Sequence, residues 1–520
     1  MPAIITDQFR ILNAETFVQS FTGIGTTTNY YYTFLAHPNP TNTTIENYGI
    51  SAWNSNPPEP KDSFQQENLY FDSMLFLKRV NYNDVSKVIP RYDWESGIIY
   101  DMYRNNYDIN NSAPQTDSKT LYDSRYYTVN SEYKVYICLN NGANPEYPNG
   151  QRSLYEPNFI DINPQQAGDG TDGYLWKYLY SILPTEIIKF STSNYISVPK
   201  KWGDPTTESI KNAAINGKIE TIIIKNRGSG YTISGGKTTG TIPNIPIIGD
   251  GFGGFASVTI NGGEIDTIQV TNGGTGYTKA FLKFGYEYSE TPTITSGSGA
   301  IFEVIIPPKG GHGYDIYREL GSYRVMVYSK YEAESDYIIG NDFSRVGIIK
   351  NPEIYGSQNQ PINSFTATNL GALKLKPVGA GNTSGTVYPN NALITQNVGV
   401  GSTAIGYVAS WNRDTGILRY YQPVGLSTFL GGNNLFNFVG SASTINCSTV
   451  IGSALIVDTN FSSDTIQIGG KIINLGQSFS SGISTPEIKK YFGEIIYIDN
   501  RAPITRSSSQ KEEVKIVVEF

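Results

Sequence analysis

Gly217-Lys-Ile-Glu-Thr-Ile-Ile-Ile-Lys-Asn-Arg-Gly-Ser-Gly-Tyr-Thr232 returns 46 residues later as Gly263-Glu-Ile-Asp-Thr-Ile-Gln-Val-Thr-Asn-Gly-Gly-Thr-Gly-Tyr-Thr278. In each copy, aliphatic residues alternate as in a strand, and a Gly-x-Gly-Tyr turn follows. Glycine suits such a turn because it adopts positive φ without a steric penalty from Cβ. The repeat predicts two copies of one β unit, stacked or paired, with Tyr231 and Tyr277 capping its core.

The sequence around the repeat also favours strands. Ile405–Trp411 and Ile417–Tyr421 flank the turn at 412–416, which is a strong hairpin signal. At the C-terminal end, Val514, Ile516, Val518 and Phe520 alternate with other residues at the strand period. The 53 glycines, 27 prolines and 38 tyrosines leave few residues that favour long helices. We therefore expect a mainly β protein, with sandwich-like or barrel-like domains and a few short helices.

Two helices are expected near the N-terminus. Asn13 can cap a first helix that follows Leu12, and Ser63 and Gln66 have the spacing of a capping box for a second helix. The proline-rich residues 56–60 separate these two segments.

Length and charge restrict the classes of protein to consider. A chain of 520 residues is long enough for roughly two to four compact units, each with its own core. Its 39 basic and 46 acidic side chains give a net charge of −7, without a basic stripe to bind a nucleic acid. Cys138 and Cys447 stand alone, which indicates thiols rather than a disulfide framework. Neither a secretory signal nor an apolar run long enough to cross a membrane is expected.

The residues that usually carry chemistry do not form recognisable motifs. His37 and His312 lack metal-ligand spacing, and we interpret His312 as a turn residue in a glycine loop. The glycine loops are not followed by the Lys-Ser or Lys-Thr of a phosphate-binding loop, and residues 169–173 suit a turn better than a calcium loop. We expect no catalytic residue, no metal and no cofactor, and hence a protein that is not an enzyme.

Several segments outside the repeat resemble the dimeric baseplate wedge protein of T-even-like bacteriophages, whose tails are contractile. The matching segments occur in the family's order and reach both ends of the chain. They are Val88–Trp94, Asn111–Pro114, Asp172–Tyr180, Asn194–Pro199, Phe343–Pro352 and Phe492–Ile504. Residues 216–308 and 364–485 do not match the family pattern.

The resemblance implies a multidomain organisation with two inserted parts. We predict a family-like core, a β-rich insertion that carries the repeat, a return to the core, a second β-rich insertion, and C-terminal core strands. The corresponding ranges are 1–215, 216–308, 309–363, 364–485 and 486–520.

The resemblance also implies a function. The chain would be a structural protein of the virion, located in the tail baseplate and assembled in the host cytoplasm. It would form a homodimer, bind other wedge subunits and take part in the rearrangement that triggers sheath contraction, without binding nucleic acid or entering a membrane. Residues in the matching segments are candidates for fold or interface roles, namely Arg91, Trp94, Tyr174, Trp176, Tyr497 and Arg501.

Two alternatives stay open at this stage. The Gly-Tyr repeat and the second insertion could form a carbohydrate-binding adhesin, because flat aromatic rings stack on sugar rings. A polysaccharide depolymerase is the weaker alternative, since two repeats are too few for the long β-helix typical of such enzymes, although its paired carboxylates could not be recognised from spacing. The discriminating observation is whether aromatic and acidic residues of the insertions converge in an exposed groove.

Overall fold

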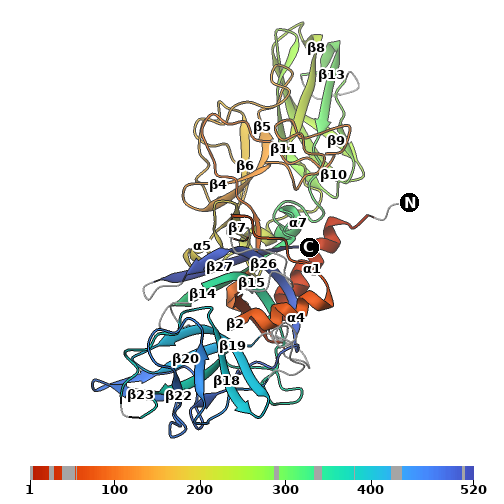
Figure 1. Ribbon diagram of the computed structural model, residues 1–520. Coiled ribbons are helices and arrows are strands. Elements are labelled where there is room, and N and C mark those ends of the chain that lie inside the picture. Colours follow the sequence, from red (N-terminus) through yellow and green to blue (C-terminus); the bar gives the residue numbers. More distant parts are fainter. Residues whose placement is uncertain are drawn as a thin grey trace. The chain divides into compact units, whose positions relative to one another are not determined.

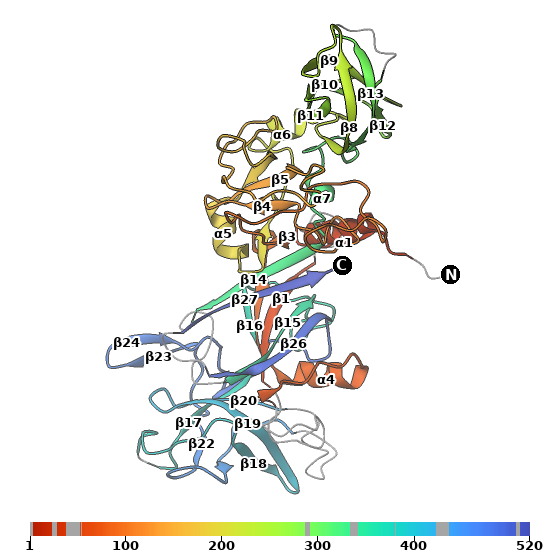
Figure 2. The same cartoon turned by 90° about the horizontal axis from the view of Figure 1, so that it is seen from above.

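The computed structural model describes residues 4–22, 29–37, 53, 55–285, 292–332, 342–379, 381–422, 436–505 and 510–520. Strands make up 43% of the chain and helices 10%, which confirms the predicted mainly β class (Figures 1 and 2). Among the described residues, none of the helices has both the length and the apolar character needed to span a membrane.

The chain divides into two compact units, each built from separate segments. The first unit comprises Met1–Val18, Ser86–Met326 and Val517–Phe520, and the second comprises Gln19–Val85 and Val327–Ile516. The unit boundaries fall within α1 (Asp7–Ser20), β3 (Val85–Pro90), β14 (Arg324–Glu332) and β27 (Lys511–Glu519). β27 confirms the predicted C-terminal strand. The five ranges predicted for core and insertions stay predictions.

Helix α1 begins earlier than predicted. Thr6, not Asn13, caps it, because the Thr6 side chain accepts a hydrogen bond from the amide of Phe9 at 3.3 Å. Asn13 lies inside the helix, since Ile11, Ala14 and Val18 already follow the helical period and are buried together. The second helix, α4 (Phe64–Ser73), starts where predicted, with Ser63 accepting from the amide of Gln66.

The central part of the first unit is a small aromatic-rich domain. Its three-stranded sheet has the order β4-β5-β6, and β3 pairs with β7. Its core includes fully buried tyrosines and the fully buried Trp176. The elements are β3 (Val85–Pro90), β4 (Tyr127–Val129), β5 (Lys134–Asn141), β6 (Tyr174–Ser181), α5 (Pro184–Phe190), β7 (Tyr195–Ser197), α6 (Glu208–Asn212) and α7 (Ile316–Glu319).

The repeat forms its own core within the first unit, and its two copies exchange strands (Figure 1). β8, the strand of the first copy, pairs with β13, while β11, the strand of the second copy, pairs with β10. Ile222 lies opposite Val304, and the residues at the repeat offset, Ile268 and Val258, lie opposite each other in the same way. The prediction of two paired copies is confirmed. The strands are β8 (Ile222–Ile233), β9 (Gly240–Gly249), β10 (Phe252–Asn261), β11 (Glu264–Thr275), β12 (Ala280–Leu282) and β13 (Ile294–Val304).

The second unit contains a five-stranded antiparallel sheet of order β16-β2-β1-β15-β26. Helix α4 leads directly into β2, and the 3-10 helix η1 (Tyr82–Asp84) follows β2. The strands are β1 (Tyr31–Ala36), β2 (Met74–Val80), β15 (Asp342–Lys350), β16 (Thr366–Thr368) and β26 (Glu494–Thr505).

A closed six-strand barrel completes the second unit, because β20 pairs both with β19 and with β17. The hairpin β19–β20 confirms the one predicted around residues 412–416. The barrel strands are β17 (Gly371–Lys376), β18 (Leu393–Gly399), β19 (Ser402–Asn412), β20 (Ile417–Tyr421), β21 (Thr444–Cys447) and β22 (Leu455–Val457). β25 (Ile483–Ser484) joins β17, and β23 (Thr465–Ile468) and β24 (Lys471–Asn474) form a separate hairpin.

Candidate functional site

Three of the predicted aromatic residues meet in the core of the first unit. The rings of Tyr174 and Trp176 stack with centroids 5.2 Å apart, and both residues are fully buried. The Tyr174 hydroxyl donates to the carbonyl of Gln151 at 2.8 Å, and burial raises the pKa of Tyr174. Trp94 packs against the same core and donates through Nε1 to the Ser153 hydroxyl at 3.1 Å. These contacts brace the fold.

The other predicted residues lie closer to the surface. Arg91 pairs with Asp93, with Nε donating to Oδ1 at 2.9 Å and Oδ2 at 3.0 Å, and this hydrogen bond raises the pKa of Arg91. Arg501 is exposed and lies 2.6 Å from Asp499. Tyr497 is half-buried, and burial raises its pKa. The structure does not gather these residues with the aromatic core residues into a single site.

The repeat-turn tyrosines are buried and equivalent. The Tyr231 hydroxyl accepts a hydrogen bond from the amide of Ala300, and the Tyr277 hydroxyl accepts one from the amide of Gly254, both at 3.1 Å. With exposures of 4% and 2%, these rings cannot present a sugar-stacking platform. Any carbohydrate site must therefore lie elsewhere.

His312 is buried, and its role goes beyond that of a turn residue. Its Nδ1 lies 2.6 Å from Oε1 of the buried Glu319, and the ring of Tyr103 packs edge-on at 4.6 Å. The second oxygen of Glu319 accepts from the amide of Gly313 at 2.6 Å. The pair closes a loop inside the first unit. Throughout the described residues, no group of three or more His, Cys, Asp or Glu side chains could hold a metal ion.

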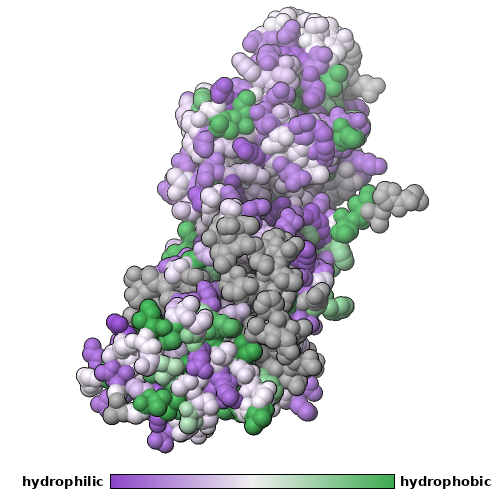
Figure 3. All heavy atoms as spheres, viewed as in Figure 1, coloured by the Kyte–Doolittle hydropathy of each residue, from purple (hydrophilic) through white to green (hydrophobic). Residues whose placement is uncertain are grey.

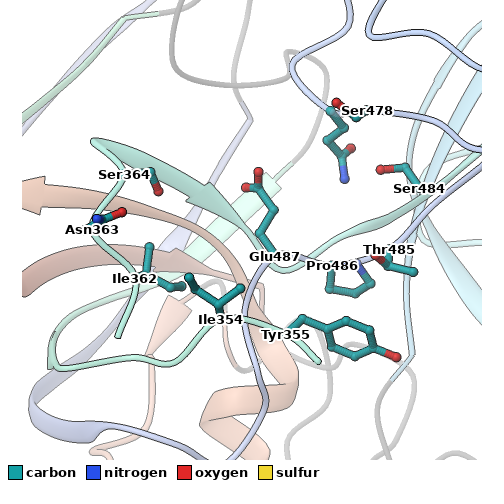
Figure 4. A pocket seen from close by; sticks show the side chains of 11 residues that line it. Ile354, Tyr355, Ile362, Asn363, Ser364, Ser478, Ser484, Thr485, Pro486 and Glu487 are labelled. Carbon is teal, nitrogen blue, oxygen red and sulfur yellow. The ribbon is translucent and has the colours of Figure 1, made fainter. Parts of the chain in front are cut away.

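The second unit has an open pocket of about 390 Å³ that the sequence did not predict. It is lined by residues 354–355, 362–364, 477–478 and 484–487 (Figure 4). Its lining combines one exposed tyrosine, Tyr355, one acid, Glu487, and several hydroxyl and amide side chains. The pocket therefore brings together an aromatic residue and an acid, but both lie in the ranges 309–363 and 486–520, outside the insertions whose residues were expected to form a carbohydrate groove.

Backbone hydrogen bonds hold the two key residues of the pocket in place. The amide of Tyr355 donates to the carbonyl of Glu487 at 2.8 Å. The amide of Glu487 donates to the carbonyl of Thr368, whose own amide donates to Oε2 of Glu487, both at 2.8 Å. Burial raises the pKa of Glu487, which the bond from Thr368 partly offsets.

Helix α1 presents a second feature, an apolar stripe on its outer side. Ile5 precedes the helix, and Phe9 and Leu12 follow at the spacing that places residues on one side of a helix. These three side chains are 70%, 54% and 59% exposed, whereas the opposite side packs into the first unit. Figure 3 shows apolar atoms, in green, where this helix begins. We call Ile5, Phe9 and Leu12 the α1 stripe.

Comparison with known proteins gives a distant and partial match. No protein-family model matches the chain. Over 226 residues the chain is 26% identical to baseplate wedge protein gp8 of Enterobacteria phage T4. The matched region covers 40% of this chain and 63% of the phage T4 protein. The chain thus spans less than two thirds of that relative's length.

Proposed function

We propose that the chain is a structural component of a phage tail baseplate, where it forms a homodimer and binds other wedge subunits. The observation that carries this proposal is the similarity to the baseplate wedge protein of phage T4. The mainly β fold, with braced aromatic cores, agrees with a scaffold role. Assembly would take place in the host cytoplasm, and the subunit would rearrange with the baseplate when the sheath contracts.

A scaffold subunit needs surfaces that partners can cover. The α1 stripe suits this role because an exposed helix with apolar side chains at regular spacing fits a groove of a partner protein. Each Å² of apolar surface that a partner covers would stabilise such a contact by about 25 cal/mol. We therefore include the α1 stripe in the surface that wedge subunits cover.

The experiment is light scattering coupled to size-exclusion chromatography, on the chain alone and mixed with the other wedge proteins of its phage. We expect a dimer that persists on dilution and enters a larger complex with the wedge proteins. A monomer or trimer that ignores the wedge proteins would contradict the proposal.

The role of the α1 stripe is tested with a double variant, Phe9→Ser with Leu12→Ser. Ile109→Ser with Ile160→Ser is the matched control, since these side chains are 81% and 65% exposed and lie outside the α1 stripe. We expect the first variant to lose wedge binding by about tenfold or more and the control to bind normally. Equal binding by both variants would remove the α1 stripe from the interface.

A further inference from the structure

The pocket of the second unit contains several side-chain groups that can form hydrogen bonds and have no partner among the described residues. Among the described residues, no partner is present for the hydroxyls of Ser478, Ser484 and Thr485 or for the side-chain amide of Asn363. Ser484 is only 4% exposed as a residue, but its hydroxyl is not among the buried side-chain atoms without a partner, so the exposed part of the residue includes this hydroxyl. These groups are therefore open to water or to a ligand, and each can donate or accept a hydrogen bond there.

The Glu487 carboxylate and the Ser484 hydroxyl face a common space. Figure 4 shows the Glu487 carboxylate pointing between Ser364 and Ser478, with the Ser484 hydroxyl directed toward the same space. Oε2 of Glu487 already accepts from Thr368, so Oε1 is available to a ligand. The pocket thus offers both donors and acceptors, which is the pattern that a ligand with several hydroxyl groups requires.

An apolar wall completes the lining. Tyr355, 47% exposed, lies beside Pro486 at the lower side of the pocket in Figure 4. The backbone bond from Tyr355 to Glu487 fixes the main chain of Tyr355 within the lining. An aromatic ring with a polar tip can stack on a flat apolar surface while its hydroxyl stays wet.

The charge of the lining selects against anions. Glu487 is the only carboxylate among the lining residues, and no lysine or arginine belongs to them. A carboxylate or phosphate in the pocket would meet the like charge of Glu487. The two neighbouring guanidinium groups are already engaged, since Arg79 donates to the carbonyl of Asn363 at 3.0 Å and Arg419 donates to the side-chain oxygen of Gln477 at 3.2 Å. The volume of about 390 Å³ lies within the range of roughly 300–1,000 Å³ of small-molecule sites.

We propose that this pocket binds a neutral sugar residue of a glycan, with Tyr355 stacking on the ring and Glu487 and Ser484 bonding to its hydroxyls. Polyhydroxylated rings have apolar faces and several donor–acceptor groups, which match the wall and the rim of the pocket. The site does not depend on the proposed scaffold role, because a baseplate subunit can have or lack a glycan pocket.

The test is ligand-detected saturation-transfer NMR on the full chain at pH 8, with glucose, galactose, mannose and N-acetylglucosamine as separate probes. We expect at least one of them to bind with a dissociation constant of about 1 mM or below. Tyr355→Ala should weaken binding by about tenfold or more. Tyr147→Ala is the matched control, because Tyr147 is 55% exposed, belongs to the first unit and does not line the pocket.

Charge selectivity provides a second, independent readout. Glucuronic acid, the carboxylated analogue of glucose, should bind about tenfold more weakly than the best neutral sugar. Glu487→Gln keeps an oxygen to accept from Thr368 and removes the charge, so it should reduce this discrimination. Circular dichroism and the thermal midpoint of each variant establish that it is folded.

Three results would overturn the proposal. One is the absence of saturation transfer to all four neutral sugars from the folded wild-type chain. Another is binding that Tyr355→Ala and Tyr147→Ala weaken equally. The third is tighter binding of glucuronic acid than of any neutral sugar. None of them bears on wedge binding, so the scaffold proposal is tested separately by light scattering.

Discussion

The strand exchange in the repeat makes a quantitative prediction about two equivalent glycines. Gly228 and Gly274 have φ of +64° and +63°, and both lie at close approaches of backbone to backbone. A Cβ on Gly274 would lie 2.6 Å from the amide nitrogen of Gly254, and one on Gly228 would lie 2.5 Å from that of Ala300. Gly262 has almost the same φ, +62°, but has open space around it.

The three alanine substitutions separate backbone strain from steric clash. Left-handed φ costs a non-glycine residue about 1–2 kcal/mol at each position. At positions 228 and 274 the clash adds about 1–3 kcal/mol, by analogy with overpacked cores. We therefore expect Gly228→Ala and Gly274→Ala to destabilise the repeat by about 2–5 kcal/mol, and Gly262→Ala by only about 1–2 kcal/mol.

The assay is hydrogen–deuterium exchange of the backbone amides in β10 and β11, read by mass spectrometry. Local exchange is preferable to global unfolding, because a chain with two compact units need not unfold in one step. Relative to Gly262→Ala, the opening equilibrium in Gly274→Ala should increase by about 5–150-fold. If the three variants exchange alike, the clash argument is wrong. If Gly228→Ala and Gly274→Ala differ widely, the copies are not energetically equivalent.

Two further predictions concern the tyrosine- and tryptophan-rich cores. Trp176→Ala should destabilise the first unit by about 3–5 kcal/mol, because it removes a fully buried ring stacked on Tyr174. Denaturant unfolding followed by tyrosine fluorescence would detect the loss, and an unchanged unfolding midpoint would refute the packing argument. Burial raises the pKa of both Tyr100 and Tyr388 to about 12, above the usual value of 10.0. The folded state therefore holds these protons more tightly, so the stability that they contribute is complete below pH 10 and falls as pH rises from 10 to 12. A spectroscopic titration should show tyrosinate forming together with unfolding, and free titration of all tyrosines near pH 10 in the folded chain would contradict it.

The sequence predicted local elements best where a short-range signal was unambiguous. The cap at Ser63 and the hairpin around residues 412–416 are found as predicted, because hydrogen bonds between near neighbours decide them. The start of α1 was predicted wrongly, because Asn13 and Thr6 are both suitable capping residues. The helix begins after Thr6 because its buried residues already follow the helical spacing from Ile11 onward.

The arrangements that depend on distant contacts were not predictable in the same way. The repeat indicated two similar β units. It could not show whether the strands of a copy pair within that copy or with strands of the other copy, because the two copies have similar sequences and either arrangement buries the same residue types. The pocket combines Tyr355 with Glu487, which are far apart in the sequence and meet only through backbone pairing. The candidate residues Tyr174 and Trp176 were recognisable as aromatic, but only packing shows that they brace a core.

The most direct test of the proposed baseplate role is immunogold electron microscopy of intact phage particles whose genome encodes the chain. Antibodies raised against the purified chain should label the end of the tail distal to the head, and mass spectrometry of washed particles should detect the chain. Labelling of the head alone, or absence of the chain from washed particles, would contradict the account.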